Sequence, residues 1–444
     1  MTRREQLYDY MKTHADEYLK VLEGAVRLET PTEGDRADLD RCRAYYRDLF
    51  EGIGCVTHEL KSLNPRFADH LLIEYGKDAG KAWEEISAWR DANRATIDAI
   101  YKGKASLTDL PSAPYGGADS KRLMFGGHYD TVHEKGIFGE PWIIDGGHAI
   151  GPGALDMKGG DCMVWMILKA FRDLGLFPAD AHIVFLLNSD EEAGSYGSSE
   201  YFRELSRHAK AAFIMESSVG IVGADPDYIG GVKAGRYGRG NYTFHAHGTP
   251  YHSGINPTFA DSALIELAQQ AIRLENMTFI DRPNAETGER ETVTVGCTAL
   301  TAGNAGWPTV PGDGDLTIDA RFSTVELAAK YDAIFRNMAS FDPGVAVTTT
   351  GGLEKPPFDR NLPGNRALQD MAVKLGAEFG VEVKLGMVRG GSDGNFTAST
   401  GCPTLDGLGV TGSRVHQLGE YINVDHLPYR LAFCAELGLR VLER

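Results

Sequence analysis

Apolar runs with the character of buried strands alternate with helical patterns along much of this chain. Residues 70–76 (HLLIEYG), 122–130 (RLMFGGHYD), 181–192 (AHIVFLLNSDEE) and 211–218 (AAFIMESS) favour strands, and residues 157–175 carry apolar side chains at helical spacing. Strands that alternate with helices in this way are typical of an α/β fold with a largely parallel sheet. We therefore expect ligands to bind beyond the carboxyl ends of these strands.

The pattern changes between about residues 235 and 352. A strand, a helix, two strands, a helix and a strand follow one another there, which is the order of the split, ferredoxin-like motif. The α/β pattern then resumes. We expect a larger domain of residues 1–234 and 353–444, with an α+β domain of residues 235–352 inserted into it. Residues 77–120 read as a further insertion, which we interpret as helices packed against the larger domain.

Composition narrows the class of partner. Lys and Arg total 45 against 62 Asp and Glu, a formal net charge of -17, which argues against nucleic acid or an anionic membrane. No apolar run approaches the roughly 18 residues that a membrane span needs. The first 24 residues predict a charged amphipathic helix rather than a signal peptide. The six cysteines are widely scattered, so we expect a reduced, cytoplasmic protein.

Histidines and carboxylates stand where the expected strands end. His128 and Asp130 are two residues apart on a strand, so their side chains can share one face. The carboxylate can then hold one ring nitrogen of His128 and leave the other to bind a ligand. Acidic side chains that converge at one sheet edge resist ionisation unless cations compensate them. Carboxylate and imidazole ligands together suit zinc, manganese or cobalt better than magnesium or calcium. The further candidates are Asp156, Asp190, Glu191, Glu192, Glu216 and His416.

Six motifs in order give the chain a resemblance to a known family. GGHYDTV, GALDMKGG, NSDEEAGSYGS, MESS, YHSGINP and VHQLGE resemble those of the dinuclear zinc peptidase and aminoacylase family. That family includes bacterial glutamate carboxypeptidase, succinyl-diaminopimelate desuccinylase, acetylornithine deacetylase and peptidase T. The inserted domain matches the family's lid, which commonly makes the dimer contact. The resemblance therefore implies a homodimer through residues 235–352.

The resemblance also implies a metal centre and the role of each residue in it. It implies two divalent ions, with zinc expected and cobalt or manganese as alternatives. The implied metal ligands are His128 and Glu216 on one ion, Glu192 and His416 on the other, and Asp156 bridging both. Glu191 would be the general base, and Asp130 would orient His128 from behind. The Asp156–Met157 peptide would be cis, as it often is in the family.

Substrate contacts are implied by the same resemblance. His252 would stabilise the oxyanion, often from the partner subunit, and Arg321 would grip a substrate carboxylate. Gly390 and Gly391 belong to a loop that would wrap the substrate, with close backbone approach. The family pattern GGxxxNxVP is altered here to AGNAGWPTVP, in which Asn304 is displaced. Carboxylate recognition is therefore changed at this point, or Asn304 substitutes through a reshaped loop.

The function that follows is hydrolysis of an amide bond. We expect a small N-acyl amino acid or dipeptide-like substrate with a free carboxylate, cleaved by a water activated by two metal ions, with Glu191 as base. A dipeptidase or aminopeptidase of the same family is the nearer alternative. A non-catalytic metal- or peptide-binding protein on this fold is the other. A phosphate-binding loop is disfavoured, because GPGALDMKGG lacks the GxxxxGK[ST] order.

Overall fold

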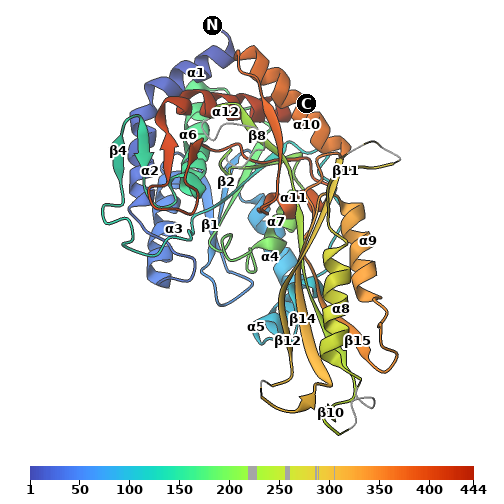
Figure 1. Ribbon diagram of the computed structural model, residues 1–444. Helices are drawn as coiled ribbons and strands as arrows, with labels where there is room; N and C mark the ends of the chain where they lie inside the picture. The colour runs from blue at the N-terminus through green and yellow to red at the C-terminus, as the bar shows by residue number, and fades with distance from the viewer. Residues whose placement is uncertain (219–227, 256–260, 286–287, 289, 305) are drawn as a thin grey trace. The chain divides into compact units, whose positions relative to one another are not determined.

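A computed structural model describes residues 1–218, 228–255, 261–285, 288, 290–304 and 306–444 (Figure 1). The chain divides into two compact units, which we call the larger unit and the smaller unit. The larger unit comprises Met1–Gly235, Arg360–Val388 and Ser392–Arg444. The smaller unit comprises Arg236–Asp359 and Arg389–Gly391.

The larger unit is built around a six-stranded sheet in the order β1-β2-β6-β3-β7-β17. Its strands are β1 (Val56–Leu60), β2 (His70–Gly76), β3 (Arg122–His128), β6 (His182–Asn188), β7 (Ala211–Ile214) and β17 (Thr404–Leu405). Strands β6, β3, β7 and β17 run parallel, whereas β1 and β2 add antiparallel pairs at one edge. Every residue of β3, β6 and β7 is buried, as expected of parallel strands covered on both faces. The predicted α/β fold with a mostly parallel sheet is confirmed.

Helices cover both faces of this sheet. They are α1 (Arg3–Thr13), α2 (Ala15–Val26), α3 (Arg36–Glu51), α4 (Lys81–Ala92), α5 (Arg94–Tyr101), α6 (Gly159–Leu174), α7 (Ser199–Ser206), α10 (Pro363–Glu378), α11 (Gly394–Ser399) and α12 (Leu427–Glu443). Leu123 and Phe125 of β3 pack in the core that contains α1, α2, α3, α6, α10 and α12. Met124, between them, faces α4, α5, α7 and α11 on the other side. Among the described helices, none combines the length and the apolar character that crossing a bilayer would require.

Glu74 of β2 fixes the start of α4, the helix that follows β2 in the chain. Its carboxylate is fully buried and accepts hydrogen bonds from the backbone amides of Ala82 (2.9 Å) and Trp83 (3.0 Å). The Nε2 atom of His182 lies 3.0 Å from the same carboxylate. A buried carboxylate that accepts three hydrogen bonds holds two distant parts of the chain together.

A four-stranded sheet in the order β18-β19-β5-β4 joins two further parts of the larger unit. Its strands are β4 (Ile143–Asp145), β5 (His148–Ile150), β18 (Gly412–Ser413) and β19 (Tyr421–Asn423). Because β19 pairs with β5, the loop between β18 and β19 lies beside the segment that follows β5. A separate two-stranded ribbon pairs β8 (Gly231–Arg236) with β16 (Lys384–Val388).

The smaller unit has a five-stranded antiparallel sheet in the order β11-β12-β14-β9-β15. Its elements are β9 (Gly238–His247), α8 (Ala263–Glu275), β11 (Phe279–Pro283), β12 (Arg290–Ala302), β14 (Asp313–Phe322), α9 (Val325–Arg336) and β15 (Ala346–Lys355). Both helices lie on one face of this sheet (Figure 1). Their buried side chains share one core with sheet residues such as Phe244 and Ile318. The four longer strands have the order of the predicted ferredoxin-like motif, and β11 is an additional edge strand. A short ribbon pairs β10 (Tyr251–His252) with β13 (Thr309–Val310).

Candidate metal centre

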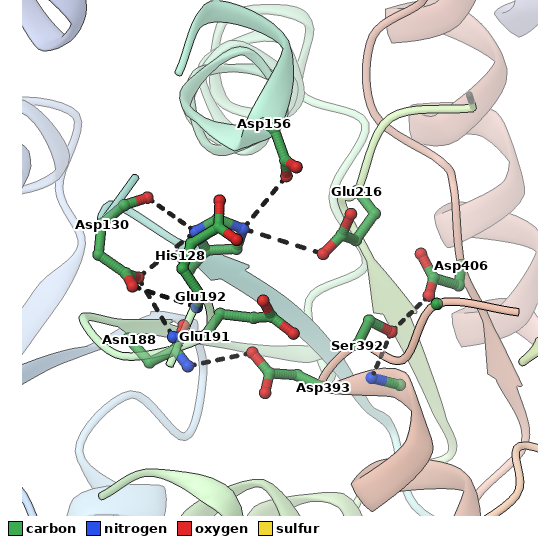
Figure 2. A network of polar contacts seen from close by, with 12 residues as sticks. His128, Asp130, Asp156, Asn188, Glu191, Glu192, Glu216, Ser392, Asp393 and Asp406 are labelled. Atoms are coloured by element: carbon green, nitrogen blue, oxygen red, sulfur yellow. Dashed lines mark hydrogen bonds and ion pairs between the residues drawn. The ribbon is translucent and has the colours of Figure 1, made fainter. Parts of the chain in front are cut away.

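Neighbouring parallel strands carry four of the candidate residues to one edge of the larger unit's sheet. Strand β3 ends at His128 and lies between β6 and β7. Strand β6 ends at Asn188, shortly before Glu191 and Glu192, and Glu216 follows β7. Since the carboxyl ends of parallel strands share one edge, these side chains meet around His128 (Figure 2).

Two further candidates reach this edge from other segments. Asp156 lies in the helical turn Ala154–Lys158 that precedes α6, and its peptide bond to Met157 is cis, as predicted. His416 lies in the loop between β18 and β19. The cluster therefore gathers residues from five separate parts of the chain.

Helix α6 lies unusually close to β7 at Gly160. A Cβ atom at this position would overlap the carbonyl oxygen of Met215, the residue immediately before Glu216. Only glycine lets the helix that follows Asp156 approach the strand end that leads to Glu216 this closely.

Three carboxylates surround the imidazole of His128. Its Nε2 atom lies 3.3 Å from Asp156 Oδ1 and 3.9 Å from Glu216 Oε1. On the other side of the ring, Nδ1 lies 3.0 Å from the backbone oxygen of Asp130 and 3.4 Å from its carboxylate. A proton held on Nδ1 by these oxygens leaves the Nε2 lone pair facing Asp156 and Glu216, as a metal ligand requires.

The second oxygen of Asp156 faces another histidine. His416 Nε2 lies 3.1 Å from Asp156 Oδ2 and 3.3 Å from Glu192 Oε2. The two oxygens of Asp156 therefore face two different imidazoles, His128 and His416. This is the arrangement that a bridging carboxylate would have.

Asp130 connects the strand end with the acidic loop after β6. It is fully buried, and its carboxylate accepts hydrogen bonds from the backbone amides of Glu191 (3.3 Å) and Glu192 (3.2 Å). The hydroxyl of Thr32 donates a further hydrogen bond to it at 2.7 Å. Asp130 therefore orients His128 and, at the same time, fixes the backbone that carries both glutamates.

The charges of the cluster depend strongly on one another. Hydrogen bonds to Asp156 and Glu192 raise the pKa of His416 to about 11. Burial and the charge of Asp156 raise the pKa of the Glu192 carboxyl to about 8. Burial disfavours the charged forms of both His128 and Asp156. Contacts with Asp130 and Asp156 outweigh burial at His128 and raise its pKa well above the usual range, and contacts with His128 and His416 keep the pKa of Asp156 well below its usual range. The carboxylates of the cluster therefore stabilise a positive charge that lies between them.

The donor set fits divalent cations. Two overlapping groups have one ligand atom from each residue, all within 4.8 Å of one another: His128, Asp156 and Glu192, and His128, Glu191 and Glu216. The Oε1 atom of Glu192 is buried and accepts no hydrogen bond from the part of the chain that the structure describes. A buried carboxylate oxygen without a partner is costly unless a cation approaches it.

Sequence reasoning missed Asp393, which supports the acidic loop that follows β6. Asp393 accepts a hydrogen bond from Asn188 Nδ2 at 3.1 Å (Figure 2) and another from the Ser195 hydroxyl at 2.6 Å. Asp190, already a candidate, accepts one from Ser198 at 2.7 Å. These polar groups are all buried. Asp393 lies in the stretch GGSDGNF, directly after the glycines that we singled out, and this proximity was the available signal.

The remaining candidates belong to the smaller unit. His252 is exposed in β10, and its Nδ1 atom accepts a hydrogen bond from the backbone amide of Gly254 at 3.1 Å. Asn304 is exposed near the start of the altered loop, two residues after β12. The carbonyl oxygens of Gly390 and Gly391 accept hydrogen bonds from Arg236 at 3.2 and 3.0 Å.

Arg321 in β14 is held by a neighbouring carboxylate. Its Nε and Nη2 atoms donate to Asp319 at 2.7 and 3.2 Å. Arg239, which lies directly opposite Arg321 on β9, donates to the same carboxylate at 2.8 Å. Asp319 therefore fixes the position of both guanidinium groups.

Comparison with known proteins identifies the family to which the chain belongs. The model of peptidase family M20/M25/M40 matches residues 124–440. The chain belongs to this family. It is 29% identical over 334 residues to carboxypeptidase G2 of Pseudomonas sp. (strain RS-16), covering 72% of this chain and 74% of that protein. It is 26% identical to succinyl-diaminopimelate desuccinylase of Methylobacterium sp. (strain 4-46), covering 70% and 78%. The protein is therefore a hydrolytic metalloenzyme of the M20 family.

Solved structures of peptidases share the fold. A tripeptidase from Staphylococcus aureus aligns with a TM-score of 0.64 at 17% identity, covering 97% of this chain and 99% of that one. A dinuclear metal binding peptidase of the M20 family from Bacillus subtilis aligns with a TM-score of 0.63 at 14% identity, with coverage of 97% and 99%. The similarity covers nearly the whole of both chains, so both the sheet domain and the inserted α+β domain belong to the family fold.

Proposed function

We propose that this M20 enzyme hydrolyses the amide or peptide bond of a small N-acyl amino acid or dipeptide-like substrate that carries a free carboxylate. The observation that carries this proposal is the position of Asp156, whose two oxygens face His128 and His416 at 3.3 and 3.1 Å. Such a carboxylate is suited to bridge two cations. Glu191 belongs to the same cluster, in the group formed with His128 and Glu216 (Figure 2).

Residues of the larger unit would hold two divalent cations, for which we propose zinc, with cobalt or manganese as alternatives. His128 and Glu216 would bind one, His416 and Glu192 the other, and Asp156 both. When bound, such a pair of cations lowers the pKa of water and polarises the scissile carbonyl.

The reaction itself needs a base, which we assign to Glu191. Its carboxylate would accept the proton of the attacking water and return it to the leaving amine. Asp130 supports this step, because its hydrogen bond to the backbone amide of Glu191 fixes the base relative to His128. Glu191 as a whole residue is only 9% exposed, which would limit the access of competing water to the proposed base.

Residues of the smaller unit would recognise the substrate. We assign the oxyanion contact to His252 and the carboxylate contact to Arg321, with Asn304, Gly390 and Gly391 as further substrate contacts. Asp319 holds the Nε–Nη2 edge of Arg321, so a substrate carboxylate would meet the Nη1 side.

A dipeptidase or aminopeptidase activity is the second candidate, and a cavity of the larger unit favours it. This cavity, of about 780 Å³, opens beside Glu192. Its lining contains the carboxylates of Glu33, Asp35, Asp38, Glu134 and Glu192. Asp38 pairs with Lys135 and Arg41, and Glu33 pairs with Arg66, so the remaining carboxylates give the cavity its excess negative charge. An acidic cavity beside the metal ligands would attract a substrate with a free amine.

The two candidate activities can be distinguished by whether the enzyme prefers substrates with a free, charged amine. Metal-loaded enzyme would be assayed with N-acyl amino acids and with dipeptides that differ only in a free amino group. A higher kcat/KM for the acylated series supports the first proposal, and a higher value for the free dipeptides supports the second. Hydrolysis of neither series by enzyme shown to hold metal would contradict both.

We also propose a cytoplasmic homodimer that associates through the smaller unit. Leu264, Ile265 and Ile272 of α8 are exposed apolar side chains, and the last two are 58% and 66% exposed. Such a row on one helix is typical of an association surface. The six free cysteines suit a reducing compartment.

A further inference from the structure

Glu420 connects three of the segments that carry candidate metal ligands. It is fully buried at the end of the loop that carries His416. Its Oε1 atom accepts hydrogen bonds from the backbone amides of Leu155 (2.7 Å) and Asp156 (3.0 Å). The other oxygen, Oε2, lies 2.6 Å from Nε2 of His133.

These partners belong to different parts of the cluster. His133 follows His128 and Asp130 in the loop after β3, and Leu155 immediately precedes Asp156. The backbone of Glu420 is fixed as well, because its carbonyl accepts a hydrogen bond from the Gly151 amide at 3.0 Å. One carboxylate thus links the loop of His416, the turn of Asp156 and the segment after His128.

We propose that Glu420 is a positioning residue that holds Asp156 where it can bridge two cations, with His133 as its anchor. Glu420 itself would touch neither cation nor substrate. Its carboxylate accepts the amide of the bridging residue, so a change in its reach would shift the oxygens that face His128 and His416. This inference rests on the metal site of the proposed function.

The chain contains a matched control for this arrangement. Glu74 is also fully buried, accepts two consecutive backbone amides and faces a histidine Nε2 atom. It pairs with Val184 near the start of β6, whereas the metal cluster lies beyond the end of that strand. The same substitution at Glu74 therefore tests buried-carboxylate stability without the metal cluster.

Two substitutions separate reach from charge. Glu420→Asp keeps the charge but withdraws the carboxylate by about 1.5 Å, one bond length. Glu420→Gln keeps the reach and an oxygen acceptor but removes the charge. If position matters, Glu420→Asp should weaken zinc binding by about tenfold or more, whereas Glu420→Gln should stay within about threefold of the parent protein. Glu74→Asp should lower Tm yet leave zinc affinity within about twofold.

Zinc dissociation constants would be measured on the full-length apoprotein by competition with a chromophoric chelator, with Tm of each apoprotein alongside. The visible spectrum of the cobalt-loaded protein reports ligand geometry, and we expect it to change in Glu420→Asp but not in Glu74→Asp. The proposal is overturned if Glu420→Asp binds zinc within about twofold of the parent, or if Glu420→Gln weakens binding as much as Glu420→Asp. A parent protein that bound no metal would instead contradict the proposed function.

Discussion

Asp130 Oδ1 accepts a hydrogen bond from the backbone amide of Glu191, with 3.3 Å between the two atoms. The residue that orients His128 is thus also one that positions the proposed base. With the roles proposed above, this hydrogen bond between the end of β3 and the loop after β6 would couple metal binding to proton transfer.

Replacing Asp130 by alanine should therefore impair both properties. We expect Asp130→Ala to weaken zinc binding and lower kcat by about 10- to 100-fold each, because its hydrogen bonds orient a ligand and a base. Thr32→Val, which removes one donor to the same carboxylate, is the milder control. Zinc titration and steady-state kinetics would measure both effects, and full metal affinity in Asp130→Ala would contradict the assignment.

The neighbouring glutamates should respond differently to the same change. Glu191→Gln should retain its metal and lose about 10²- to 10⁴-fold in kcat, since a base is removed. Glu192→Gln should weaken metal binding, in contrast to Glu191→Gln, because a buried carboxylate oxygen of Glu192 is a proposed metal ligand. Metal analysis and kinetics of the two variants would decide, and the opposite pattern would reverse the two roles.

Metal content tests the cluster as a whole. We expect two equivalents of divalent metal per chain in the active enzyme, loss of activity with chelators, and recovery with zinc, cobalt or manganese. Elemental analysis of fully active protein provides the count. One equivalent or none would rule out the bridging role of Asp156.

Arg321 and Arg239 provide a matched pair in the smaller unit, because both bind Asp319. Arg321→Ala should raise KM by about tenfold for substrates with a free carboxylate and leave their amides unaffected. Arg239→Ala should change KM little. Equal effects of the two variants would show that the arginines only stabilise the sheet.

His252 can be tested for action across a dimer. We expect His252→Ala to lower kcat by about 10²-fold, since an oxyanion donor acts mainly in the transition state. Mixing it with Glu191→Gln should restore part of the activity, because one heterodimer site would be intact. With subunit exchange demonstrated, absence of recovery would place His252 within its own chain or outside the reaction.

The sequence was sufficient for those features that have a local pattern. The apolar runs predicted β3, β6 and β7, and the acidic tips after them marked the cluster around His128. The predicted N-terminal helix is in fact divided into α1 and α2 at His14, which lies between them. Strand β11 was missed, since its sequence FIDRP lacks alternation and ends in proline.

Supporting residues such as Glu420 could not be predicted in the same way. Its partners are backbone amides some 265 residues away, and an amide leaves no signature in the sequence. His133 was visible beside His128, but nothing in the sequence paired it with Glu420. Contacts of this kind depend on how the segments pack, so they became apparent only in the folded chain.

Gly160 has a consequence for how such a centre can change over evolutionary time. The approach of the Asp156 turn to Glu216 is permitted by the lack of a single methyl group on α6, and not by either carboxylate. A saturation mutagenesis screen should therefore find Gly160 as intolerant as the ligands themselves, although it contributes no ligand atom. Conversely, a lineage that acquired alanine here would first have to move the start of α6 away from Met215, and with it the turn that carries Asp156.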